Sequence, residues 1–298
     1  MNKIFYNLVL IPFIFNFGYT QESKDSIPLL DLSKIALVNQ TDSYVTFPTD
    51  IGNIAPLMFE GNISPSFIIR KRKDSRLMAA LTSQIIIRMY NEESYPVQTP
   101  SYIPQVSFYY VMGNKQSKIH NTFFGRIAHH SNGQDGNFYD ENELINLLSG
   151  NFATNFFEIG IIKTSHSSSL NAVKFFKSSI EVHPKSWMLE ELQGQYSGLR
   201  WHNTFTAFKL PFFKSDKDSN PNFSLKVETS LMLDNYNNLN TFDLNRLNAS
   251  LTFYYHPKFL EDIGLFVQFY HGMDYYNIYF QEKLDVIRFG IMTEILRF

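Results

Sequence analysis

The sequence predicts an all-β protein whose strands close into a transmembrane antiparallel up-and-down β-barrel of about 12 strands. Three features predict this fold: strict alternation of apolar and polar residues, unusually long strands, and a high aromatic content. Aromatic residues make up 16% of the chain, with 29 Phe, 17 Tyr and 2 Trp. Such residues favour β-strands and membrane interfaces.

Alternation with a period of two residues is the main signal, and it is clearest in residues 223–233. One face of this segment is almost entirely apolar and consists of Phe223, Leu225, Val227, Thr229, Leu231 and Leu233. Residues 246–255 and 263–272 follow the same pattern. Runs of about ten residues are long for a soluble β-sandwich, but they have the length that a tilted strand needs to cross a bilayer.

We predict ten strands from residue 77 onward and two weaker strands between residues 53 and 70. The ten strands cover residues 77–90, 103–112, 119–131, 153–163, 170–183, 198–210, 222–234, 246–256, 262–273 and 284–298. The longer polar connections between them alternate with mostly shorter turns. This asymmetry is expected of extracellular loops and periplasmic turns.

The N-terminal segment predicts export. Residues 1–20 contain Lys3 followed by an apolar stretch from Ile4 to Phe17, which is typical of a cleavable signal peptide. Residues 21–50 lack a clear period and are expected to form a periplasmic lead-in, so that residues 51–298 form the barrel. Phe298 ends an apolar strand, as is characteristic of outer-membrane barrels, and we therefore expect the Gram-negative outer membrane as the location.

Composition excludes several other classes of function. The chain contains no Cys, which rules out disulfides, thiolate chemistry and a lipid-anchored N-terminal cysteine. The net charge of −2 and the absence of a long basic stripe exclude nucleic acid as a partner. The basic run at residues 70–73 is interpreted as a solvated strand end.

Polar residues on the predicted outer face are more informative than those in the lumen, because a polar group facing lipid is costly. In residues 123–131 the predicted outward residues are Phe123, Gly125, Ile127, His129 and Ser131. On the next strand they are Ala153, Asn155, Phe157, Ile159 and Ile161. Three polar side chains therefore interrupt two adjacent apolar faces.

These three side chains form a candidate catalytic site. His129 and Ser131 share one side of the sheet, and Asn155 reaches His129 from the neighbouring strand. Ser131 would then be the nucleophile, His129 the base, and Asn155 the group that orients the imidazole. A His-x-Ser spacing is frequent by chance, so polar interface residues at a strand end are the alternative interpretation. The neighbouring His130 is expected to point into the lumen.

Motifs at four separated places resemble one known family. Residues 129–133 match a His-x-Ser-Asn-Gly signature, and Asn155 lies at the start of the following strand. The other three places are residues 91–96 with 102–105, residues 268–272, and residues 289–298. In these segments, in the same order along the chain, the sequence resembles outer-membrane phospholipase A.

The resemblance implies a calcium-dependent homodimer that hydrolyses membrane phospholipids by A1 or A2 acyl cleavage. It implies that the backbone amide of Gly133 contributes to the oxyanion hole. The carbonyl of Gln134, the Ser149 hydroxyl and Ser94 of the partner subunit would bind calcium, and no other cofactor is implied. A neutral amide and a hard cation both stabilise a developing oxyanion.

The sequence departs from the family in the loop between Ser131 and Asn155, which is longer. Its acidic residues, Asp135, Asp140, Glu141 and Glu143, do not follow the order of an EF-hand loop. They form either an acidic surface loop or additional calcium ligands. A non-catalytic channel or surface scaffold that keeps the strand pattern is the alternative function.

Overall fold

The computed structural model describes residues 32–113, 117, 119–167, 172–210, 223–257, 259–260 and 263–293. The predicted signal peptide over residues 1–20 and the terminal Phe298 lie outside these residues. Two connections between strands, residues 168–171 and 211–222, also lie outside them.

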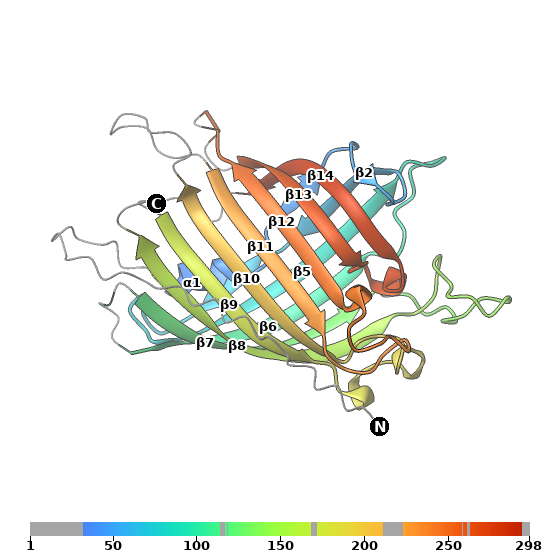
Figure 1. Ribbon diagram of the computed structural model, residues 1–298, viewed down its shortest axis with the longest axis horizontal. Coiled ribbons are helices and arrows are strands. Elements are labelled where there is room, and N and C mark those ends of the chain that lie inside the picture. The colour runs from blue at the N-terminus through green and yellow to red at the C-terminus, as the bar shows by residue number, and fades with distance from the viewer. Residues whose placement is uncertain are drawn as a thin grey trace, which may run out of the picture.

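The described chain folds into a closed antiparallel β-barrel, and the predicted fold is confirmed (Figure 1). The strands are β1 (Tyr44–Thr46), β2 (Ile51–Gly52), β3 (Leu57–Ile63), β4 (Ser66–Ile69), β5 (Leu77–Tyr90), β6 (Ser101–Met112), β7 (Ile119–Ser131), β8 (Ala153–Ser167), β9 (Ala172–Val182), β10 (Leu199–Leu210), β11 (Phe223–Met232), β12 (Leu247–Tyr255), β13 (Ile263–Met273) and β14 (Lys283–Thr293). Neighbours in the chain from β5 to β14 pair in sequence order. The sheet closes where β1 pairs with both β14 and β3.

The first two positions of the barrel wall differ from the prediction. Strands β3 and β4 share one place in the order of the sheet, because both pair with β5. The other position comes from β1 and β2, which both pair with β14. The fourteen strands therefore make twelve positions in the wall. Strand β1 lies within the predicted lead-in of residues 21–50, and strands of two or three residues are too short to show an alternating pattern.

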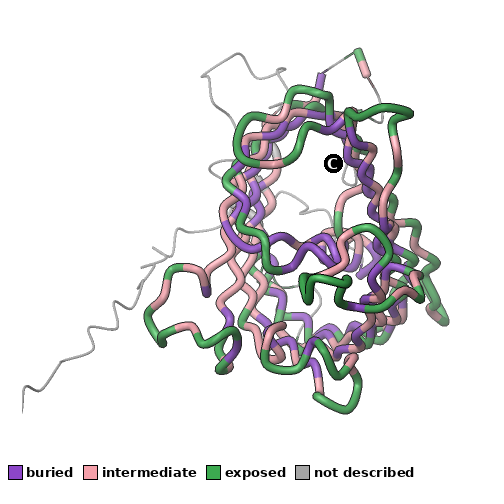
Figure 2. Tube along the Cα trace, turned by 90° about the vertical axis from the view of Figure 1, so that its right-hand side faces the viewer, coloured by how far each residue is buried: buried purple, intermediate pink, exposed green. Residues whose placement is uncertain are grey.

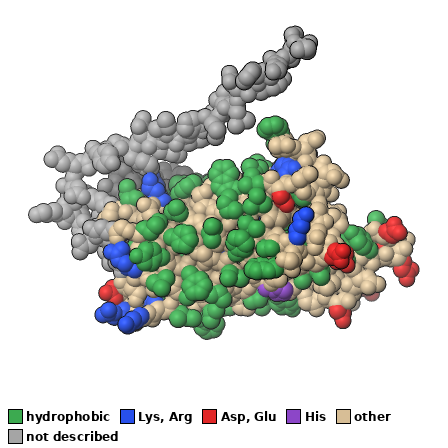
Figure 3. Space-filling model, turned by 90° about the horizontal axis from the view of Figure 1, so that it is seen from below, with side chains coloured by type: hydrophobic (Ala, Val, Ile, Leu, Met, Phe, Trp, Pro, Cys, Tyr) green, Lys and Arg blue, Asp and Glu red, His purple; other side chains and the backbone are tan. Residues whose placement is uncertain are grey.

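Large apolar side chains cover the outside of the wall. The exposed ones include Phe67, Leu81, Phe108, Tyr110, Phe123, Ile127, Ile159, Ile161, Phe176, Phe253, Leu265 and Phe269. Figure 3 shows hydrophobic side chains as a broad band on one face of the molecule, with Asp and Glu side chains gathered mainly toward one end. A continuous apolar belt of this kind is the surface that a bilayer requires of a barrel. In the described part of the chain, no helix is long and apolar enough to span a membrane.

Two segments enter the barrel from opposite ends. Helix α1 (Leu32–Val38) buries its apolar side chains against Met78 near the start of β5 and Tyr109 on β6. The loop of residues 274–282, which contains the 3-10 helix η4 (Asn277–Tyr279), packs around Tyr90 at the other end of β5. Figure 2 shows buried stretches of chain crossing the interior of the ring of strands.

A buried group of ion pairs fastens the second of these segments to the wall. Arg88 on β5 pairs with Glu60 on β3 at 2.7 Å and with Asp274 of the loop at 2.6 Å. Arg288 on β14 pairs with the other oxygen of Glu60 at 2.7 Å. Buried charges persist only when they are paired and hydrogen-bonded, as these are. The loop of residues 274–282 is therefore held inside the lumen next to β5.

Candidate active site

Strands β7 and β8 place the three predicted catalytic side chains at one end of the barrel wall. In the antiparallel register His129 lies opposite Asn155, and Ser131, the last residue of β7, lies opposite Ala153. The predicted alternation is confirmed, because Ile127 is 56% exposed on the outside whereas His130 is 7% exposed. His129 and Ser131 thus share the outer face, at the end of β7 that follows the exposed Ile127.

The imidazole of His129 is oriented by the Asn155 amide. His129 Nδ1 and Asn155 Oδ1 lie 2.9 Å apart, and Asn155 Nδ2 donates to the carbonyl oxygen of Trp187 at 3.0 Å. A carbonyl only accepts, so the amide nitrogen must face Trp187 and the amide oxygen must face His129. Nδ1 of His129 therefore carries the proton, and Nε2 is the nitrogen that can accept one.

The buried side chain of Asn132 shapes the turn after Ser131. Its Oδ1 accepts the amides of Gln134 at 3.2 Å and Phe152 at 3.0 Å, and its Nδ2 donates to the carbonyl of Gly150 at 2.7 Å. Three hydrogen bonds from one side chain join the two ends of the loop of residues 132–152. The turn beside Ser131 is therefore held rigidly, as a preorganised site requires.

Gly133 follows in a left-handed conformation with φ 67°. This backbone region is readily adopted by glycine and disfavoured for other residues. A Cβ at this position would also lie 3.3 Å from Cε2 of Tyr102, whose residue pairs with Ser131 across β6 and β7. The turn two residues after Ser131 therefore favours glycine.

Two of the oxygen donors implied for calcium lie on adjoining parts of one loop. Gly136 and Gly150 form a parallel bridge, and a Cβ on Gly136 would come within 2.3 Å of the Ser149 carbonyl oxygen. This contact brings the segment after Gln134 next to Ser149. Carbonyl and hydroxyl oxygens are ligand types that calcium takes, so the chemistry of these two residues is compatible with the implied ion. Ser94 is exposed at φ 68° in the loop between β5 and β6, and its contact with a partner subunit stays a prediction.

The acidic residues of the longer loop are mostly on the surface. Asp140 Oδ1 accepts the amides of Asn142 at 2.8 Å and Leu144 at 3.0 Å, so this carboxylate closes a local turn. The side chains of Asp135, Glu141 and Glu143 are exposed. Across the residues that the structure covers, no group of three or more His, Cys, Asp or Glu side chains could hold a metal ion. The exposed side chains and the turn closed by Asp140 are compatible with an acidic surface loop, and calcium ligation by these carboxylates stays a prediction.

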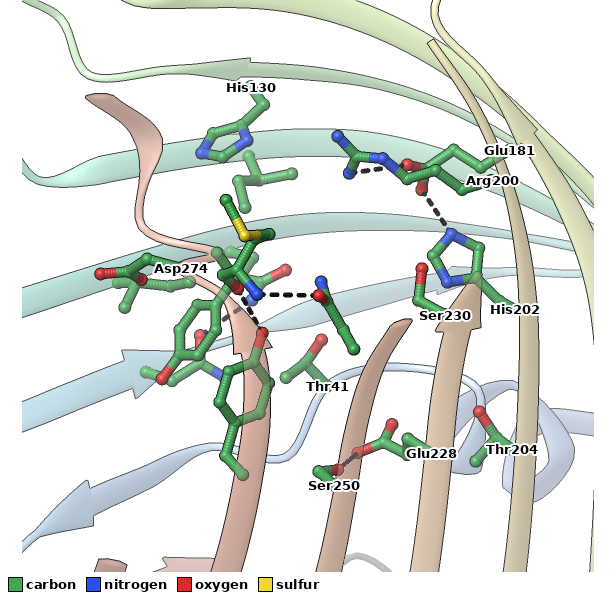
Figure 4. A pocket seen from close by; sticks show the side chains of 18 of the residues that line it. Thr41, His130, Glu181, Arg200, His202, Thr204, Glu228, Ser230, Ser250 and Asp274 are labelled. Atoms are coloured by element: carbon green, nitrogen blue, oxygen red, sulfur yellow. Dashed lines mark hydrogen bonds and ion pairs between the residues drawn. The ribbon is translucent and has the colours of Figure 1, made fainter. Parts of the chain in front are cut away.

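His130 lies on the lumen side of the site. Its Nε2 contacts Ser101 Oγ at 3.2 Å, and Asn277 Nδ2 donates to the same hydroxyl at 2.8 Å. Figure 4 shows His130 at the wall of the lumen cavity, which has a volume of about 400 Å³. This imidazole therefore does not share a face with Ser131.

A second buried histidine supports β8 from the lumen side. His183, in the loop after β9, contacts Thr154 Oγ1 at 2.9 Å and Glu181 Oε1 at 2.9 Å. Burial lowers the pKa of His183 below its usual value, so its neutral form prevails at neutral pH. Thr154 precedes Asn155, so the position of this part of β8 is fixed from inside the barrel.

Sequence reasoning gave no role to two residues beside the site. Trp187 supplies the carbonyl that holds Asn155, and Tyr102 lies against the Gly133 turn. Trp187 belongs to a loop without a motif, and its backbone contact carries no sequence signal. Tyr102 could have been found by extending the outward alternation to the strand before Ser131.

No family model and no curated protein matches the sequence. The fold, in contrast, belongs to a class of barrel that is known from solved structures. Outer membrane phospholipase A from Escherichia coli has a TM-score of 0.55 and 12% sequence identity, covering 93% of this chain and 96% of that chain. An asparagine-to-alanine active site mutant of that enzyme has a TM-score of 0.54 and 11% identity over 93% and 96%.

A third solved structure is the Salmonella typhi outer membrane phospholipase dimer with bound calcium. Its TM-score is 0.56 and its identity 11%, over 86% of this chain and 91% of that chain. At 11% to 12% identity these similarities establish a common fold. They do not by themselves assign an activity to this chain.

Proposed function

We propose that the protein is a calcium-dependent phospholipase of the Gram-negative outer membrane, an acyl hydrolase of the A1 or A2 type that acts on membrane phospholipids as a homodimer. The observation that carries the proposal is the hydrogen bond between His129 and Asn155 on the outer face, with Ser131 two residues away. A nucleophile and an oriented base above an apolar belt are suited to an ester at the membrane boundary.

The chemistry assigned to these residues is acyl transfer. Ser131 Oγ attacks the ester carbonyl while His129 Nε2 takes its proton and then gives it to the leaving glycerol oxygen. Water, activated by the same nitrogen, releases the fatty acid from Ser131. Asn155 keeps the imidazole in the required tautomer, and the Gly133 amide donates to the oxyanion.

The residues that would hold calcium are the Gln134 carbonyl, the Ser149 hydroxyl and Ser94 of the partner subunit. A bound calcium ion would add positive charge near the developing oxyanion. The adjoining segments around Gly136 and Ser149 support two of these assignments. A solved dimer with bound calcium has a similar fold, which supports the general proposal of calcium and a partner subunit.

Hydrolysis of phospholipid in detergent micelles, with calcium or with a chelator, tests the proposal. We expect release of fatty acid that requires calcium, while the chelated protein keeps the heat-modifiable electrophoretic mobility of a folded barrel. Ser94→Ala should raise the calcium concentration for half-maximal activity by on the order of 10-fold, because one oxygen ligand is lost.

Ser117→Ala is the matched control, since Ser117 is an exposed serine in the connection between β6 and β7. An unchanged calcium requirement in Ser94→Ala would remove Ser94 from the site. Full activity of a monomeric, chelated sample would contradict both the calcium and the dimer proposals.

Asn155→Ala is expected to retain measurable activity. The third member of a triad orients the base without touching the substrate, so its loss should cost about 10²-fold less than the loss of the nucleophile. Initial rates measured alongside Asn121→Ala provide the comparison. Asn121 is an exposed amide on β7, on the same outer face of the sheet as His129. Equal rates for the two variants would exclude Asn155 from the mechanism.

The alternative function, a passive channel or scaffold, predicts a different result. A channel would let solutes leak from liposomes whether or not Ser131 is present. Helix α1 and the loop of residues 274–282 occupy parts of the lumen from both ends. This arrangement favours the enzyme over the channel.

A further inference from the structure

The loop between β9 and β10 continues the barrel wall beside Asn155. Strand β9 ends at Val182, opposite Phe157, so the first residues of β8 extend beyond it. There Met188 forms an antiparallel bridge with Thr154, and the Leu189 amide donates to the Ala153 carbonyl at 3.1 Å. The segment of residues 187–189 therefore pairs with the start of β8, where β9 has already ended.

This segment fixes the orientation of Asn155. The carbonyl oxygen of Trp187 accepts from Asn155 Nδ2 at 3.0 Å, while Asn155 Oδ1 faces His129 at 2.9 Å. If the carbonyl moved away, the amide could rotate and present its nitrogen to the imidazole. The tautomer of His129 that leaves Nε2 as proton acceptor would then no longer be favoured.

The indole of Trp187 anchors the carbonyl on the outer face. It lies edge-on to the ring of Phe157, with centroids 6.5 Å apart and an angle of 79° between the planes. Phe157 is two residues from Asn155 on β8, so both lie on the same side of the sheet. Trp187 is 44% exposed at this rim, where indole rings pack well between apolar and polar surroundings.

We propose that Trp187 is a positioning residue for the catalytic asparagine: its indole, resting on Phe157 at the membrane boundary, holds the carbonyl that orients Asn155. The inference deepens the proposed function and rests on it. According to this inference, the position of the loop between β9 and β10 at the lipid interface affects the geometry of the triad. Trp187 touches no reacting atom and acts only through Asn155.

The kinetic test is a double-mutant cycle on phospholipid micelles with saturating calcium. We expect Trp187→Ala to lower kcat by on the order of 10-fold with little change in KM, and Trp187→Phe to restore most of it. In an Asn155→Ala background the same change should have no further effect. Additive losses would overturn the proposal, as would a loss confined to KM.

Trp201→Ala is the matched control, because Trp201 is the only other tryptophan and is similarly exposed, on β10. Its indole donates to Ser178 and takes no part in the site. The activity of the Trp201→Ala variant should equal that of the unmodified protein. Heat-modifiable mobility verifies that each variant is folded, and Trp187→Phe preserves a test if Trp187→Ala does not fold.

A spectroscopic test does not depend on activity. In the Trp201→Phe protein, Trp187 is the sole indole, so its emission reports on this loop alone. We expect Asn155→Ala to shift the emission to longer wavelength and to increase quenching by acrylamide, because the Trp187 carbonyl loses its hydrogen bond with Asn155 and the residue becomes more mobile. Unchanged emission would overturn the contact even in an active enzyme. An inactive unmodified protein would overturn the proposed function even if the emission shifts.

Discussion

Ser131→Ala is expected to reduce phospholipid hydrolysis by about 10⁴-fold or more, because acylation requires the hydroxyl oxygen that this change removes. The barrel should still fold, since Ser131 is a half-buried side chain at the end of β7 and fills no core position. Fatty acid release in micelles measures the rate, and heat-modifiable mobility reports the fold.

Ser83→Ala provides the control for this result. Ser83 is an exposed serine on the outer face of β5, and β6 separates it from β7, so its loss should leave hydrolysis unchanged. Substantial activity in Ser131→Ala would exclude Ser131 as the nucleophile. Liposome leakage in the same variant would instead favour the channel.

His129→Ala should produce a loss close to that of Ser131→Ala, because the nucleophile and its base act as a unit. The double variant should therefore be little worse than either single one. Rates for the three proteins, measured at equal concentrations of folded barrel, check this expectation. Losses that multiply in the double variant would show that the two side chains do not work together.

His130→Ala is the control that the strand itself provides. The adjacent imidazole bonds to Ser101 inside the lumen, so its removal should cost about 1 kcal/mol of barrel stability and little activity. A larger catalytic loss from His130→Ala than from His129→Ala would mean that the lumen histidine is the base.

The sequence by itself determined which side chains share a face. Because successive residues of a strand point to opposite sides, alternation alone placed His129 and Ser131 outside and His130 inside. It also predicted the bounds of β5 and β7, where long apolar periods end at polar loops. The candidate triad follows from this local rule together with the pairing of two consecutive strands.

Only the tertiary structure decided how the rest of the chain completes the barrel and the site. Helix α1 enters the lumen and β1 joins β14, although residues 32–46 show no strand period. Asp140 caps a turn, and the Trp187 carbonyl holds Asn155. Such contacts depend on backbone groups or on residues far apart in the chain. Many residue types could make them, so the sequence leaves no local pattern by which to recognise them.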